Sequence, residues 1–195
     1  MKKIAVFASG TGSNFQALVD AVKAGTLEAD IRLLVCDQPS ASVLQRAHKE
    51  EIDWLSISPK DFPDKGAFET EIVQQLKLRD VEFIVLAGYM RLIGPTLLQE
   101  YPGAIVNIHP SLLPAFPGKD AIGQALDAGV QVSGLTIHYV DAGMDTGPII
   151  AQKEIRILSD DSKVDLQKRI QQQEHLIYPE ILQELFTKGK TSVSL

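Results

Sequence analysis

The stretch Asn107-Ile108-His109-Pro110-Ser111-Leu112-Leu113-Pro114 follows a short apolar run, Gly103–Val106, of the kind that forms a buried strand. Side chains two positions apart on an extended chain share a face, so Asn107 and His109 should project together where the strand ends. The prolines disfavour helical geometry and stiffen the loop that follows. Because open parallel sheets carry their ligand chemistry at the carboxyl ends of their strands, this pair predicts a reactive site there. Alternatively, the two side chains simply cap the strand and its turn.

Strand-like and helical patterns alternate along the first half of the chain. Lys3–Ala8, Ile31–Cys36 and Val81–Ala87 are apolar runs typical of buried strands, and the segments between them repeat apolar residues at helical spacing. This alternation predicts a doubly wound α/β fold whose mostly parallel sheet carries helices on both faces.

The pattern changes after Pro114. Gln131–Val140 and Ile149–Leu158 read as two late strands, which we expect to be antiparallel, and a long C-terminal helix begins near Ser162. No linker, repeat or low-complexity tract interrupts the sequence. Residues 1–195 are therefore predicted to form a single domain.

Composition and charge narrow the functional classes. The 195 residues carry a formal net charge of −6 without a Lys/Arg stripe, which argues against a nucleic-acid binder. No run approaches the roughly 20 apolar residues that a membrane span needs, and the first residues do not read as a signal peptide. Cys36 is the single cysteine, and no Cys/His cluster has zinc spacing. We therefore expect a cytoplasmic protein with no metal.

A glycine-rich turn, Ser9-Gly10-Thr11-Gly12-Ser13-Asn14, joins the first strand to a helix. Such a turn presents free backbone N–H groups at the positive end of the helix, where phosphates bind. Ser13 and Asn14 add side-chain donors, so the turn predicts an anion site. The alternative is a tight strand-to-helix turn in which Ser13 is the helix cap.

Three further segments could serve either a ligand or the fold. Met90 to Ile93 could line a slot for a flat ring or fill the core. Gln171 and Glu174, three residues apart, share a helical face that could reach a ligand or lie in solvent. Lys65, in the polar loop from Ser58 to Gly66, could contact a ligand or be solvated.

The chemistry must come from groups other than an enzyme nucleophile, because the chain shows no serine in a nucleophile elbow and no plausible Cys–His pair. Asn107 can donate to an oxyanion, and losing one such donor typically slows a reaction by about 10²–10³. His109 suits proton transfer, and a carboxylate nearby would favour its charged form. Asp145 is the candidate, although Asp and Gly also favour turns on their own. These groups predict acyl-type transfer to a phosphate-bearing acceptor.

Three segments, Ser9–Asn14, Asn107–Pro114 and Asp141–Pro148, together resemble the phosphoribosylglycinamide formyltransferases, a folate-dependent family of purine synthesis. The resemblance covers nearly the whole chain and implies a formyltransferase, Rossmann-like fold. The Asn-x-His-Pro-Ser-Leu-Leu-Pro motif is shared with other formyltetrahydrofolate enzymes. The Gly-Ser-Asn turn distinguishes this family, in which it binds the ribose phosphate of the substrate.

The resemblance implies direct formyl transfer from 10-formyltetrahydrofolate, the co-substrate, to the amine of 5-phosphoribosylglycinamide, without a covalent enzyme intermediate. Asn107 would stabilise the tetrahedral oxyanion, and His109 would act as general acid on the departing folate nitrogen. Asp145 would hold His109 protonated and, through water, help to deprotonate the amine. Thr136 and His138 occupy positions that support this centre in the family. The expected partners are these two small molecules alone, and the expected state is a monomer or homodimer.

The resemblance also implies two sets of binding residues. Those for the glycinamide substrate are Gly12, Ser13, Asn14, Gln171, Gln172, Gln173 and Glu174. Those for the folate are Lys65, Met90, Arg91, Leu92, Ile93, Asn107, Asp141, Ala142, Gly143, Met144 and Asp145. Some members of the family have Arg where this chain has Lys65, and lysine cannot form the bidentate carboxylate pair that arginine forms.

Two rival functions compete with this one. A formyltetrahydrofolate hydrolase would use water as acceptor and would have little use for the turn at Gly12-Ser13-Asn14. A non-catalytic dinucleotide-binding module would use Gly10-Thr11-Gly12 and Asp37. That module needs a third glycine where Phe15 stands, and it would leave Asn107 and His109 without a role.

Overall fold

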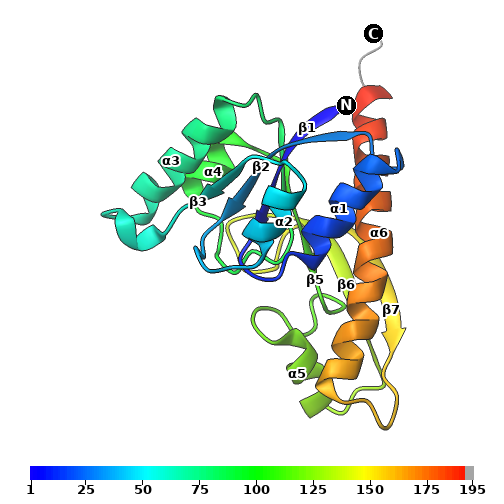
Figure 1. Ribbon diagram of the computed structural model, residues 1–195. Helices are drawn as coiled ribbons and strands as arrows, with labels where there is room; N and C mark the ends of the chain where they lie inside the picture. Colours follow the sequence, from blue (N-terminus) through cyan, green and yellow to red (C-terminus); the bar gives the residue numbers. More distant parts are fainter. Residues whose placement is uncertain (192–195) are drawn as a thin grey trace.

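The computed structural model describes residues 1–191 (Figure 1). Its strands are β1 (Lys2–Ala8), β2 (Ala29–Cys36), β3 (Trp54–Ser56), β4 (Phe83–Leu86), β5 (Ile105–His109), β6 (Val132–Tyr139) and β7 (Ile149–Arg156). They form one sheet in the order β3-β2-β1-β4-β5-β6-β7. β1 to β5 are parallel, whereas β6 pairs antiparallel with β5 and β7 antiparallel with β6. The predicted mostly parallel sheet with late antiparallel strands is therefore confirmed.

Helices cover both faces of the sheet, as the apolar pattern predicted (Figure 1). The helices are α1 (Ser13–Lys23), α2 (Val43–Lys49), α3 (Lys65–Lys77), α4 (Pro95–Glu100), α5 (Ala121–Asp127) and α6 (Lys163–Thr191), with a 3₁₀ turn η1 at Pro59–Asp61. Alternate residues of the strands point to opposite faces. Ile4 and Val6 of β1 pack in the core beneath α1, α2, α5 and α6, and Ala5 and Phe7 pack beneath α3 and α4.

The strand order explains where a ligand cavity can open. From β1 the chain moves outward to β2 and β3, and then returns to β4 on the other side of β1. Right-handed crossovers therefore place α1 and α2 on one face and α3 and α4 on the other. The loops after β1 and β4 lead away to opposite faces, which leaves an opening between them at the carboxyl edge.

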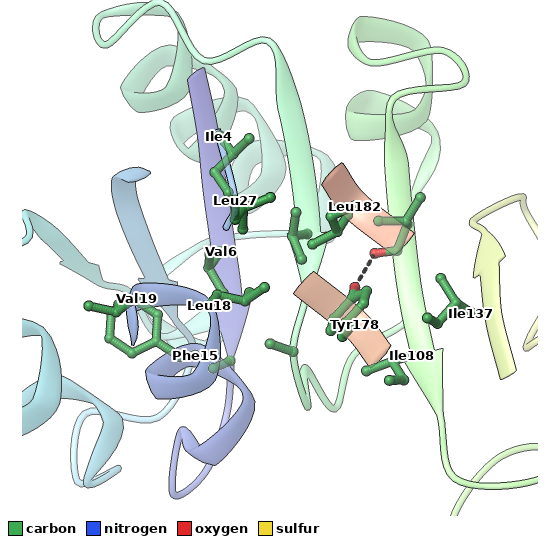
Figure 2. Packing of buried hydrophobic residues seen from close by; sticks show 14 of the residues in the cluster. Ile4, Val6, Phe15, Leu18, Val19, Leu27, Ile108, Ile137, Tyr178 and Leu182 are labelled. Atoms are coloured by element: carbon green, nitrogen blue, oxygen red, sulfur yellow. Dashed lines mark hydrogen bonds between the residues drawn. The ribbon is translucent and has the colours of Figure 1, made fainter. Parts of the chain in front are cut away.

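Helix α6 is tied to the same edge by a buried tyrosine (Figure 2). The hydroxyl of Tyr178 donates to the carbonyl oxygen of Leu86, the last residue of β4, at 2.9 Å and lies 3.4 Å from that of Val106 in β5. Burial raises the pKa of Tyr178 well above its ordinary value, so the hydroxyl stays a donor. Tyr178 therefore fixes α6 against the two strands that lead into the predicted site.

Two local predictions differ from the structure. The segment Ser58–Gly66, expected to be a loop, contains η1, and its end already belongs to α3, which Asp64 caps by accepting from the N–H of Ala67. The short helix α4 was not predicted. Pro95 suits the first position of α4. The N–H groups of Gly94 and Leu97, at the start of this helix, donate to Glu69, a residue of α3 that is distant in sequence. Within residues 1–191, no helix is both long enough and apolar enough to cross a bilayer.

Candidate active site

A cavity of about 680 Å³ opens at the carboxyl edge of the sheet, where the topology predicts it. The loops after β1, β4 and β5 line it, together with the loop between β6 and β7 and one face of α6. The lining includes Gly10 to Asn14, Gly88 to Ile93, Asn107 to Pro110, Gly118 to Ile122, His138, Gly143 to Asp145, Gln167, Ile170, Gln171 and Glu174.

Strand pairing brings the polar side chains of β5 and β6 together. In the antiparallel register Asn107 lies opposite His138, and His109 lies opposite Thr136. Directly opposed residues share a face, so all four point to the same side of the sheet. The amide nitrogen Nδ2 of Asn107 lies 3.2 Å from Nε2 of His138. Asn107 is therefore in β5 itself, and its amide is oriented by a cross-strand contact.

Asp145 reaches this centre from the loop between β6 and β7. Its Oδ2 lies 3.4 Å from Nδ1 of His109 and accepts from the N–H of Gly118 at 2.7 Å, and its Oδ1 lies 3.6 Å from Nε2 of His138. Burial favours the neutral acid, but His138, the Gly118 N–H and the charge of His109 outweigh it, so the pKa of Asp145 lies below its ordinary value. Asp145 is therefore a carboxylate, and the predicted approach of Asp145 to His109 is confirmed.

The imidazole of His109 has an acceptor on each side. Its Nε2 lies 2.9 Å from the carbonyl oxygen of Phe116, and its Nδ1 faces Asp145. A carbonyl oxygen only accepts hydrogen bonds, so Nε2 carries a proton in this arrangement. Nδ1 of His109 lies beside a carboxylate oxygen, so each ring nitrogen faces an acceptor.

Thr136 supports the centre without lining the cavity. It is fully buried, and its hydroxyl donates to the carbonyl oxygen of Ser111 at 2.6 Å and accepts from the N–H of Leu113 at 3.0 Å. These bonds fix the turn that follows His109. We therefore assign Thr136 to the shape of the turn and not to contact with a substrate.

The glycine-rich turn forms the opposite part of the cavity. Gly12 has φ +74° and is the N-cap of α1, and a Cβ atom there would lie 2.4 Å from Cγ2 of Val43. Both the backbone and the space therefore require glycine. Ser13 is the first residue of the helix and makes no capping bond, so the alternative in which Ser13 caps α1 is wrong. The first N–H groups of α1 have no partner within the helix, and a helix end of this kind suits an anion.

Helix α6 meets the first turn of α1 through a side-chain hydrogen bond. Nδ2 of Asn14 donates to Oε2 of Glu174 at 2.9 Å, whereas Oδ1 of Asn14 is buried with no hydrogen-bond partner. Burial raises the pKa of Glu174, and the bond from Asn14 offsets part of that effect. Gln171 lines the cavity, but Gln172 and Gln173 do not, because the helix turns them away from it.

Residues 90–93 were expected either to line a slot or to fill the core. Met90 and Leu92 are 70% and 45% exposed and line the cavity, together with the 56% exposed Met144. Ile93 both lines the cavity and belongs to the core beneath α3. The segment therefore both lines the cavity and contributes to the core, and its exposed apolar side chains suit a flat ring.

Three of the expected folate-binding residues lie outside the cavity lining. The ammonium Nζ of Lys65 donates to the carbonyl oxygen of Leu92 at 2.7 Å. Oδ1 of Asp141 accepts from the N–H of Gly143 and the hydroxyl of Thr146, at 3.0 and 2.7 Å, and so shapes its own loop. Ala142, beside it, is exposed and also does not contribute to the lining.

The buried carboxylate of Asp37 fixes the side chain of Arg91. Nε of Arg91 donates to Oδ2 of Asp37 at 2.6 Å, and the hydroxyl of Ser9 donates to Oδ1 of the same carboxylate at 2.5 Å. Asp37 directly follows β2, and Ser9 directly follows the neighbouring β1. Their places at adjacent strand ends are the signal that could have paired them. The sequence carries no such signal for the backbone groups of Phe116 and Gly118, which contact His109 and Asp145.

A family model described as formyl transferase matches residues 2–182, so the chain belongs to the formyl transferase family. Within this family it is 57% identical to the phosphoribosylglycinamide formyltransferase of Bacillus subtilis (strain 168) over 95% of both chains. A crystal structure of glycinamide ribonucleotide transformylase 1 from Geobacillus kaustophilus matches with a TM-score of 0.93 at 60% identity, covering 95% of this chain and 98% of that one. The phosphoribosylglycinamide formyltransferase structure from Bacillus halodurans matches at 0.94 and 53%, covering 96% and 97%. Within the part of the chain that the structure describes, no three His, Cys, Asp or Glu residues are grouped to hold a metal ion.

Proposed function

We propose that this chain transfers the formyl group of 10-formyltetrahydrofolate to the amine of 5-phosphoribosylglycinamide in purine biosynthesis. The observation that carries the proposal is the meeting of Asn107, His109 and Asp145 in one cavity with the glycine-rich turn at Gly12. The reacting groups and an anion-binding helix end therefore face the same space. The similarity to phosphoribosylglycinamide formyltransferases supports the same activity.

The reaction is a direct acyl transfer. The lone pair of the glycinamide amine attacks the formyl carbon, and the carbonyl electron pair moves to oxygen, where an N–H of Asn107 stabilises the oxyanion. When the carbonyl re-forms, the bond from the formyl carbon to folate N10 breaks and its electron pair goes to N10. His109 gives its proton to N10, and Asp145 stabilises the imidazolium beforehand. The proton lost by the amine leaves through water beside Asp145.

The acceptor occupies the end of the cavity at α1. Its phosphate accepts hydrogen bonds from the free N–H groups of Ser13 and Asn14 and is stabilised by the positive end of the helix dipole. The unpartnered Oδ1 of Asn14 can accept a hydrogen bond from a ribose hydroxyl. Gln171 and Glu174 line the same end, so they can contact the sugar or the glycinamide group.

The folate donor occupies the apolar end, between Met90 to Ile93 and Gly143 to Asp145. Gln172 and Gln173 remain predictions of the resemblance that the cavity lining does not support. Asp141 and Ala142 act through the shape of their loop.

Acceptor dependence separates this function from its rivals. The assay follows the absorbance of the deformylated folate product with and without 5-phosphoribosylglycinamide. Turnover that requires the acceptor supports the transferase, and equal turnover without it identifies a hydrolase. No turnover favours the dinucleotide module, although the pairing of Asp37 with Arg91 already removes the acidic group that would bind a ribose.

Three broader predictions belong to the same proposal. We propose that residues 1–195 form a single domain, that the protein is cytoplasmic, and that it is a monomer or a homodimer without nucleic-acid or membrane partners. Sedimentation equilibrium tests the oligomeric state directly.

A further inference from the structure

The loop from Gly88 to Gly94 is held from outside by two side chains of α3, one helical turn apart. Nζ of Lys65 donates to the carbonyl oxygen of Leu92 at 2.7 Å. Oε1 of Glu69 accepts from the N–H of Gly94 at 2.6 Å. The two side chains lie 3.9 Å apart as an ion pair. We call this arrangement the α3 bracket, and it fixes one carbonyl and one N–H group of the loop.

The bracket is tightly packed. Glu69 is 2% exposed and also accepts, through Oε2, from the N–H of Leu97 in the first turn of α4. A Cβ atom on Gly94 would lie 2.7 Å from both carboxylate oxygens of Glu69 and 2.7 Å from Cε of Lys65. These atoms leave no room for a side chain at Gly94, so the backbone of the loop lies directly against both side chains of the bracket.

The bracket touches the loop and not the cavity. Leu92 and Ile93 line the cavity, whereas Lys65 and Glu69 do not. On its other side the loop is anchored where the N–H of Met90 donates to the hydroxyl of Ser9 at 2.9 Å. The cavity-facing segment therefore spans two fixed points.

We infer that Lys65 and Glu69 are positioning residues that set the place of the Gly88–Gly94 loop, and with it the slot for the ring of the folate donor. The inference rests on the proposed function, because it takes the occupant of the slot to be a reduced folate. It differs from a direct contact of Lys65 with the carboxylate tail of the donor. A latch on the loop affects every donor that enters the slot, whereas a contact with the tail affects only donors that carry the tail.

The test compares two donors in one experiment: 10-formyltetrahydrofolate and 10-formyltetrahydropteroate, which is the same donor without its glutamate. Lys65→Met keeps an unbranched side chain, one atom shorter than that of lysine, and removes the charge. The loss of one charge-assisted hydrogen bond to the loop should weaken binding by about tenfold. We expect the KM of both donors to rise by the same factor, with kcat and the KM of the glycinamide substrate within twofold of wild type.

A second variant, Gly94→Ala, disturbs the packing of the bracket and keeps the charge of Lys65. Gly94 has φ −100° and ψ 179°, an extended geometry open to any residue, so Gly94→Ala changes only the space beside Glu69 and Lys65. It should reproduce the rise for both donors. Lys65→Arg keeps a cation that can reach the Leu92 carbonyl and should restore near-native KM values.

The matched control is Lys77→Met. Lys77 is on the same helix and pairs with Glu100 of α4 at 2.6 Å, away from the loop. The variant removes a lysine that bridges α3 and α4, but it should leave the KM of both donors unchanged.

Calorimetric binding of both donors is measured beside turnover, so the bracket is tested even if the wild type transfers no formyl group. Absence of wild-type turnover would count against the proposed function alone. Equal weakening of both donors by Lys65→Met, in binding or in KM, supports the bracket. Weakening confined to the donor with glutamate, or no weakening of either, overturns it.

Discussion

Replacing Asp145 with Asn is the most direct perturbation of the proposed centre. The amide keeps the shape of the carboxylate and an oxygen for the Gly118 N–H, which donates at 2.7 Å. What is removed is the negative charge 3.4 Å from Nδ1 of His109. The variant therefore isolates the electrostatic part of the interaction.

The distance sets the size of the effect. Two unit charges 3.4 Å apart attract by about 5 kcal/mol at an effective dielectric constant of about 20, and by about 1 kcal/mol in bulk water. Asp145 is mostly buried, with 12% of its side chain exposed, so the value lies between these limits. Because about 1.4 kcal/mol corresponds to a factor of ten, turnover should fall by about 10²–10³.

The assay is acceptor-dependent formyl transfer at saturating concentrations of both substrates. We expect kcat to fall by the stated factor while the KM of the donor changes less than about threefold, since the lost charge stabilises the proton that His109 gives to N10 and does not hold the donor itself. Asp161→Asn is the matched control, because Asp161 is another ion-paired carboxylate, 2.6 Å from Arg169 and outside the cavity lining. A kcat of Asp145→Asn within threefold of wild type would refute the role assigned to the charge.

Three further predictions concern the acceptor, the fold and pH. Asn14→Ala should raise the KM of the glycinamide substrate by about tenfold and leave that of the donor unchanged in steady-state kinetics, because Asn14 lies at the acceptor end. Tyr178→Phe removes the buried hydroxyl that donates to the carbonyl of Leu86, and urea denaturation should show a loss of about 1–3 kcal/mol in the free energy of unfolding. The Arg169 guanidinium lowers the pKa of Asp161 to about 2 from its ordinary 3.8. The stabilisation from this pair is complete above pH 4 and disappears as pH falls through about 2, so denaturation of wild type and Asp161→Asn should converge in that range.

The fold could be predicted because its signals are local. The apolar runs that became β1, β2 and β4, and the helical spacing between them, need only neighbouring residues to be recognised. The helix α4 shows the limit. It has six residues, and its N-terminal N–H groups depend on Glu69, 25 residues away from Gly94. A helix whose ends are satisfied by a distant side chain leaves little trace in its own sequence.

The site residues also fall into two groups, those that the sequence indicates and those that it does not. Asn107 and His109 could be paired from strand periodicity, and Asp145 from the charge that a protonated imidazole requires. The carbonyl of Phe116 and the N–H of Gly118 could not, because any residue type supplies a backbone group. Side-chain chemistry is written in the sequence, whereas the backbone atoms that complete a site appear only when the loops are in place.

Lys65 shows how the two kinds of information combine. A lysine in a polar segment could be solvated or could bind a ligand, and neither interpretation included a bond to the back of a binding loop. In the structure the first turn of α3 points its ammonium group at the Leu92 carbonyl, while a buried carboxylate one turn later holds Gly94. Both charges are then engaged outside the cavity, so the shape of the slot depends on residues that a donor never touches. Variation at such positions can change donor affinity while every contact residue stays the same.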